Sequence, residues 1–154
     1  MDLIRPGEGM KTKGDFPNIN SKEPDGIKDD GTAFRVLVVD DSMFVSKQIG
    51  QILTSEGFEI VGTAADGLEG LEKYKELYPN VDLVTMDITM PKMDGVTALE
   101  KIIEFDKNAT VIMISALGKQ DLVKTALVKG AKNYIVKPLD RIKVLERIVQ
   151  TLGK

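Results

Sequence analysis

Cysteine and histidine are both absent from the 154 residues of the chain. Without cysteine the chain has no disulfides, no thiolate metal sites and no thiol nucleophile. Without histidine it has no Ser-His-Asp or Cys-His nucleophile system, no histidine zinc site and no histidine that could accept a phosphoryl group. Carboxylates, hydroxyls and amines are the groups left for any chemistry.

Long apolar runs and a strong positive charge are missing as well. No stretch approaches the roughly 20 apolar residues that cross a bilayer, and residues 1–6 lack the apolar core of a signal peptide. The net charge of −3 provides no basic face for a phosphate backbone. The length suits one domain, and 42% hydrophobic residues favour a folded core over disorder. We therefore expect a cytoplasmic protein with neither a membrane nor a nucleic-acid partner.

Residues 1–33 differ in composition from the rest of the chain. They contain three of the six prolines (Pro6, Pro17 and Pro24), charges of both signs and no helical or strand period. We interpret them as a flexible N-terminal tail and expect the folded domain to span residues 34–154. The tail is either a solvated extension without function or a docking or regulatory segment.

From Phe34 onwards short apolar runs alternate with amphipathic stretches. The apolar runs predict five buried strands, over residues 35–39, 58–63, 81–86, 110–114 and 134–136. Apolar residues at helical spacing predict five helices, over residues 43–56, 66–78, 96–103, 119–129 and 145–152, with Ser42 as the cap of the first. Short connections between alternating strands and helices predict a doubly wound α/β fold, with a parallel sheet covered by helices on both faces.

Reactive side chains directly follow four of the predicted strands. Asp40 and Asp41 follow the first strand, Asp87 the third, Ser115 the fourth and Lys137 the fifth. In doubly wound sheets the site lies beyond the carboxyl ends of the strands, near the point where the strand order reverses. Each residue alone has an ordinary explanation, such as helix capping by an Asp pair. Their convergence on one edge of the sheet favours a functional site.

Clustered carboxylates require either raised pKa values or a cation. Two like charges about 4 Å apart repel by roughly 4 kcal/mol at an effective dielectric near 20, and an all-oxygen ligand set suits Mg²⁺. We predict Asp40 and Asp41 as metal ligands, with Asp87 as the nucleophile toward phosphorus. Lys137 is the expected counter-ion, and Ser115 the expected hydroxyl donor to a phosphoryl oxygen. No G-x-x-x-x-G-K-[ST] loop is present, so the phosphoryl group must arrive on a donor.

Four motifs together resemble the response regulator receiver family. They are residues 39–42 (VDDS), 86–95 (MDITMPKMDG), 115–116 (SA) and 134–138 (YIVKP), within a resemblance that covers residues 34–154. The resemblance implies the flavodoxin-like strand order 2-1-3-4-5 and phosphoryl transfer from a histidine kinase to Asp87. It also implies that Asp87 is a third carboxylate ligand of Mg²⁺, that the backbone carbonyl of Thr89 is a further ligand, and that the peptide bond before Pro138 is cis.

Within that family the sequence is similar to the CheY-type, single-domain chemotaxis branch. Residues 84–91 match that branch, and no room for a DNA-binding domain follows the last helix. The similarity implies a monomeric signalling protein rather than an enzyme, with a CheA-type sensor kinase, the flagellar motor switch protein and an auxiliary phosphatase as partners. It further implies an output surface on the fourth helix, fifth strand and fifth helix, with Ser115, Val123 and Tyr134 as switch residues.

Two departures from the branch and several alternatives remain. Thr89 and Leu117 replace residues that are more often Asn and polar, respectively, and both flank the route of the hydrolytic water in the family. A phosphate sink, or a regulator of a non-motility pathway, would use the same fold. A haloacid-dehalogenase-type phosphatase needs a second Asp where Ser42 stands. A flavodoxin-like electron carrier is disfavoured because Asp40 and Asp41 would repel its phosphate.

Overall fold

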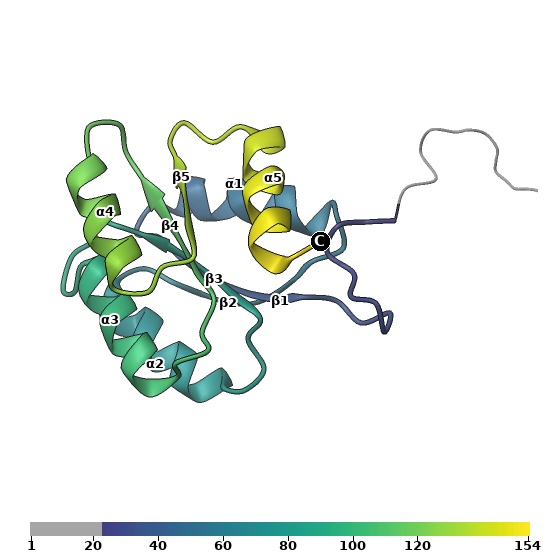
Figure 1. Ribbon diagram of the computed structural model, residues 1–154, viewed down its shortest axis with the longest axis horizontal. Coiled ribbons are helices and arrows are strands. Elements are labelled where there is room, and N and C mark those ends of the chain that lie inside the picture. Colours follow the sequence, from purple (N-terminus) through teal and green to yellow (C-terminus); the bar gives the residue numbers. More distant parts are fainter. Residues whose placement is uncertain (1–22) are drawn as a thin grey trace, which may run out of the picture.

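The structure is a computed structural model, and it describes residues 23–154. Its elements follow one another in the order β1 (Arg35–Val39), α1 (Met43–Thr54), β2 (Glu59–Ala64), α2 (Gly67–Leu77), β3 (Leu83–Asp87), α3 (Gly95–Phe105), β4 (Val111–Ser115), α4 (Gln120–Val128), β5 (Asn133–Val136) and α5 (Arg141–Leu152). The strands form one parallel sheet in the order β2-β1-β3-β4-β5 (Figure 1). The predicted doubly wound fold and strand order are confirmed.

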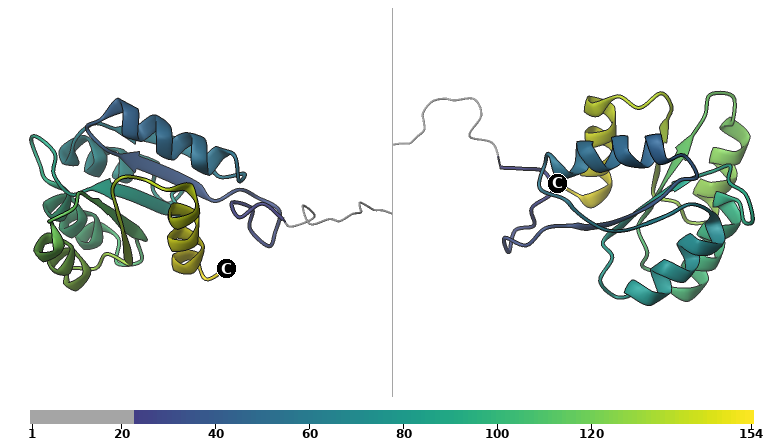
Figure 2. Two further views of the ribbon diagram at one scale, coloured as in Figure 1. Left: turned by 90° about the horizontal axis from the view of Figure 1, so that it is seen from above. Right: turned by 180° about the vertical axis from the view of Figure 1, so that it is seen from behind.

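Helices cover both faces of this sheet (Figure 2), and each helical layer packs on it through apolar side chains. One layer packs α1 and α5 on the sheet, and its largest buried side chains include Ile49, Leu53 and Ile148. The other packs α2, α3 and α4 on the opposite face. Because helices cover both faces, every residue of β3 and β4 is buried. This explains why those strands are mainly apolar, with only Thr85, Asp87 and Ser115 as polar residues.

Polar side chains fix where several helices begin. The Ser42 hydroxyl accepts a hydrogen bond from the backbone N–H of Val45 at 3.3 Å, which confirms it as the cap of α1. Asp66 accepts from the N–H of Glu69 at 2.8 Å at the start of α2. Asp94 caps α3 in the same way through the N–H of Thr97, at 2.9 Å. No helix within residues 23–154 is long and apolar enough to cross a membrane.

Residues 24–34, named here the N-terminal strap, lie against the domain. Ile27 and Ala33 form an isolated antiparallel bridge within the strap, and the N–H of Gly26 donates to the carbonyl of Glu56 at 2.7 Å. Residues 24–33, which the sequence places in the tail, thus contact the folded domain. The strap binds largely through backbone groups, which composition does not reveal. The rest of the expected tail, residues 1–22, lies outside the described residues.

Candidate acidic site at the carboxyl edge of the sheet

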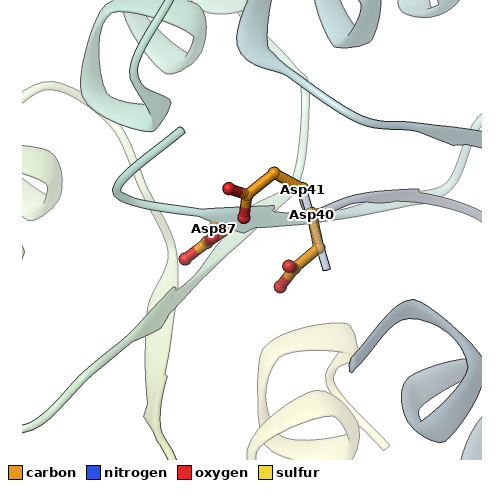
Figure 3. A group of neighbouring side chains, drawn as sticks. All are labelled: Asp40, Asp41 and Asp87. Carbon is orange, nitrogen blue, oxygen red and sulfur yellow. The ribbon is translucent and has the colours of Figure 1, made fainter. Parts of the chain in front are cut away.

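Three carboxylates meet where β1 and β3 end. Asp40 and Asp41 follow β1 directly, and Asp87 is the last residue of β3. One oxygen from each lies within 4.8 Å of the others. Figure 3 shows the three side chains gathered in one place. Asp40 and Asp87 are buried, whereas Asp41 is exposed. The sequence analysis expected this convergence, and the fold provides it because parallel strands end at the same edge.

Lys137 supplies the positive charge that faces the buried pair. Its Nζ lies 3.5 Å from Oδ1 of Asp87 and 3.6 Å from Oδ2 of Asp40. The backbone N–H of Lys137 donates to the carbonyl of Ser115 at 2.7 Å, which fixes the start of the loop after β5. The peptide bond between Lys137 and Pro138 is cis, as the family resemblance implied.

The two buried carboxylates, Asp40 and Asp87, are held in an environment that opposes their full ionisation. Burial, followed by the charge of Asp40, raises the pKa of Asp87 to about 6, although Lys137 acts in the opposite direction. Burial also raises the pKa of Asp40, despite the hydrogen bond from the Ser42 N–H and the charge of Lys137. One ammonium therefore does not compensate three carboxylates.

The donor set fits a hard divalent cation. Oδ1 of Asp40 accepts a hydrogen bond from the Ser42 N–H at 2.8 Å, while Oδ2 is buried without a hydrogen-bond partner. The Lys137 ammonium lies 3.6 Å from this oxygen but is shared with Asp87, so a further cation would still be favourable beside the buried carboxylates. Three carboxylates with no sulfur or nitrogen ligand match the preference of Mg²⁺ for oxygen. The residues present thus fit the predicted metal.

Thr89 lies in the loop between β3 and α3, two residues beyond Asp87, and its side chain is exposed. This loop returns tightly to the sheet, because the N–H of Gly95 donates to the carbonyl of Ile88 at 2.7 Å. A Cβ atom at position 95 would lie only 2.0 Å from the carbonyl oxygen of Asp87. In the sequence, Gly95 stands out only as a member of the motif over residues 86–95. Its structural role is to let the loop approach the end of β3, and no separate feature of the sequence indicates that role.

Lys92 is a second residue of this loop that no pattern in the sequence marks as special. Its backbone has a positive φ of 66°, a conformation that only a few per cent of non-glycine residues adopt. Its Nζ lies 3.9 Å from Oδ2 of Asp66 at the start of α2, and the carbonyl of the next residue, Met93, accepts from the N–H of Gly67 at 3.0 Å. These contacts hold the loop that carries Thr89 against α2.

The predicted switch residues lie together, and Ser115 directly follows Ile114, the β4 residue that pairs with Asp87. Ser115, Val123 and Tyr134 line one groove of about 240 Å³ between the loop after β4, α4 and β5. The Ser115 side chain is buried, and its hydroxyl donates to the carbonyl of Ala116 at 2.9 Å. Leu117, at the mouth of the groove, is 75% exposed. The predicted bond from Ser115 to a phosphoryl group therefore requires its hydroxyl to turn away from Ala116.

Comparison with known proteins identifies the family of this fold and site. The model of the response regulator receiver domain matches residues 36–149. The chain belongs to this family. It is 72% identical over 143 residues to the chemotaxis protein CheY of Treponema pallidum, covering 93% of the chain and 99% of the relative. It is 52% identical over 121 residues to CheY of Bacillus subtilis, covering 79% and 99%.

A solved structure agrees with this assignment. A chain in the crystal structure of the CheX-CheY-BeF3-Mg complex from Borrelia burgdorferi is 63% identical to this one, with a TM-score of 0.83. The match covers 86% of this chain and all of that one. Within its family the chain is thus a CheY-type response regulator of chemotaxis. The haloacid-dehalogenase and flavodoxin-like alternatives do not agree with this assignment.

Proposed function

We propose that Asp87 accepts a phosphoryl group from a CheA-type sensor histidine kinase, and that this changes affinity for the flagellar motor switch protein. The observation that carries the proposal is the position of Asp87, buried at the end of β3 between two other carboxylates and the Lys137 ammonium. A carboxylate in that position is a nucleophile with charge stabilisation already in place.

In the proposed step, an Asp87 carboxylate oxygen attacks phosphorus as the bond from phosphorus to the donor nitrogen breaks. The electron pair of that bond stays on the donor nitrogen, and an acyl phosphate forms on Asp87. Lys137 lies close enough to bind a phosphoryl oxygen as the charge moves toward Asp87. Asp40, Asp41, Asp87 and the carbonyl of Thr89 would hold Mg²⁺, which neutralises charge on phosphoryl oxygens when it is bound.

The Ser115 hydroxyl would bind another phosphoryl oxygen after leaving the Ala116 carbonyl. Because Ser115 and Tyr134 line the same groove, this change can alter the groove between α4 and β5. The face formed by α4, β5 and α5 is the proposed output surface, with Val123 and Tyr134 as its switch residues. The exposed Leu122, Leu127 and Val128 on α4 offer apolar contacts to a partner there.

Two measurements test this proposal. Acetyl phosphate with Mg²⁺ should add one phosphoryl group to the wild type and none to Asp87→Asn, and normal labelling of the variant would contradict the assignment of Asp87. Beryllofluoride should then raise the affinity of the wild type for a motor switch peptide. Labelling without any change in peptide affinity would favour the alternative of a phosphate sink or a non-motility regulator.

We also propose an auxiliary phosphatase of the CheX type as a partner. The support is the similarity to the CheY chain that is in complex with CheX in the Borrelia burgdorferi structure. Purified CheX should shorten the lifetime of the phosphorylated protein. A lifetime that CheX leaves unchanged would remove this partner and leave the kinase and motor switch assignments untouched.

A further inference from the structure

The N-terminal strap binds the residue that lies just beyond the last helix. Nζ of Lys154 donates to the carbonyls of Asp25 and Ile27, at 2.9 and 2.6 Å, and lies 5.6 Å from the centroid of the Phe34 ring. Helix α5 ends at Leu152. Hydrogen bonds from a charged donor are stronger than neutral ones. The carboxyl end of α5 is therefore fastened to the strap, and Figure 1 shows the two side by side.

Glu56, just after α1, connects the strap to the other end of α5. Its Oε1 accepts from the N–H of Asp25 at 3.0 Å, and its backbone carbonyl accepts from the N–H of Gly26. Its Oε2 lies 3.1 Å from a guanidinium nitrogen of Arg141, the first residue of α5. Arg141 also donates to the Ser55 hydroxyl at 2.6 Å. One carboxylate thus contacts both the strap and the start of α5.

The strap is seated closely on the turn between α1 and β2. A Cβ atom on Gly26 would lie 2.3 Å from the backbone nitrogen of Phe58 and 2.6 Å from the carbonyl oxygen of Glu56. The Ile27 side chain packs over Gly57, where an added Cβ would lie 3.1 Å from Cδ1 of Ile27. Position 26 therefore admits no side chain unless the strap moves.

The second part of the strap, residues 28–34, is held on the domain by an ion pair and by an aromatic contact. Nζ of Lys28 lies 3.2 Å from the Asp82 carboxylate, which also accepts from the N–H of Arg35 at 2.8 Å. Burial would raise the pKa of Asp82, but these hydrogen bonds outweigh it and the pKa is lowered. The rings of Phe34 and Phe58 lie 6.1 Å apart, centroid to centroid. Both parts of the strap, residues 24–27 and 28–34, thus contact the domain.

From these contacts we infer that the N-terminal strap restrains α5 by binding near both of its ends, and so sets the affinity of the output face for its partner. The second half of this inference rests on the proposed function, because α5 is one of the three elements of the proposed output surface. The acidic cluster lies at the opposite ends of the strands, since the strap enters β1 at Arg35 and Asp40 follows β1. The strap can therefore act on α5 without touching the phosphorylation chemistry.

Amide hydrogen exchange in the full, unphosphorylated chain tests the restraint. Gly26→Ala displaces the strap, and Gly50→Ala is its matched control, because an added Cβ at position 50 meets nothing within 4 Å. Amides of the strap and of the last turn of α5 should exchange on the order of tenfold faster in Gly26→Ala than in Gly50→Ala. Amides of α2 and α3 should not change. If the strap amides exchange faster but the α5 amides exchange at the same rate as in Gly50→Ala, the strap does not restrain α5.

A second variant and a binding measurement complete the test. Lys154→Gln removes only the ammonium that binds the strap. If Gly26→Ala does not fold, the restraint on α5 can still be measured in this variant. It should speed exchange in the last turn of α5, and unchanged exchange there would count against the restraint.

In both variants the affinity for a motor switch peptide with beryllofluoride should shift at least threefold. If the peptide affinity stays unchanged although α5 exchanges faster, the inference that the strap sets the affinity of the output face is overturned. Failure of the wild type to bind any peptide would instead overturn the proposed function, and the exchange result would stand.

Discussion

The ammonium nitrogen of Lys137 lies 3.5 Å from Oδ1 of Asp87. This distance puts a fixed positive charge beside the carboxylate that, in our proposal, also binds Mg²⁺ and accepts the phosphoryl group. The same charge should therefore repel the metal and attract the phosphoryl oxygens. Each effect can be measured separately.

Replacing Lys137 with Met should have opposite effects on the two ligands. Mg²⁺ affinity should rise roughly 3- to 10-fold, because a nearby positive charge is removed. Beryllofluoride affinity at saturating Mg²⁺ should fall by about tenfold, since one charge-assisted contact is lost. Titrations with Mg²⁺ alone and with the mimic check both. A fall in Mg²⁺ affinity would show that Lys137 organises the carboxylates rather than competing with the metal.

Asp87→Asn should stabilise the metal-free protein in a pH-dependent way. The folded pKa of Asp87, about 6, lies above its ordinary value of 3.8. The stability that comes from its protonated form is fully present below about pH 4 and is lost as the pH rises through 6. Asparagine should therefore add about 1 to 3 kcal/mol at pH 7.5 and almost nothing at pH 4. Thermal melts in EDTA at the two pH values check this, and an equal gain at both would refute it.

Asp41→Ala should remove phosphorylation and leave stability almost unchanged. Asp41 is exposed, so its loss opens no cavity, but it supplies one of the three carboxylates of the cluster. Labelling by acetyl phosphate at millimolar Mg²⁺ should disappear, while the melting temperature without metal stays within about 2 °C. Wild-type labelling rates in EDTA would contradict the metal role altogether.

Ser115→Ala should leave Asp87 able to be phosphorylated but weaken its coupling to the partner. In the wild type, a switch peptide should raise the affinity for beryllofluoride, because linked sites influence each other equally. Without the hydroxyl this increase should shrink severalfold. Thr54→Ala is a suitable control, because its exposed hydroxyl bonds within α1, to the carbonyl of Gln51, away from the proposed output surface. Equal coupling in Ser115→Ala and the wild type would mean that the signal leaves the site by another route.

Two N-terminal deletions should differ sharply. Removing residues 1–22 keeps all strap contacts described above, so the melting temperature should change little. Removing residues 1–33 also deletes the bonds to Glu56 and Lys154 and should lower it by roughly 5 °C. Differential scanning calorimetry of the two deletions checks this. Equal melting temperatures would mean that the strap adds nothing to stability.

The sequence predicted most of the sheet and the acidic cluster because both depend on local patterns. Strands β3 and β4 are buried on both faces, so they are mainly apolar, with only Thr85, Asp87 and Ser115 as polar residues. Asp40 directly follows β1 and Asp87 ends the parallel strand β3, so their convergence follows from topology alone. The bond from Ser115 to Ala116 was not predictable, because a hydroxyl orientation leaves no trace in the sequence.

The strap shows what composition cannot predict. Its contacts with Glu56 and Lys154 are mainly bonds to backbone groups, and such bonds need no particular side chain on the strap. Gly26 is required for its fit, yet a glycine among prolines and charged residues is also what a tail would contain. Only the distance between segments far apart in the chain distinguishes the two cases.

The bond from Lys154 to Asp25 also has a consequence for the topology of the chain. Residues at the two ends of the fold lie within hydrogen-bonding distance of each other. A short linker could therefore join residue 154 to residue 24, while the backbone is opened in the exposed turn at Lys107 between α3 and β4. Such a circular permutant should keep the same sheet order although β4 becomes its first strand.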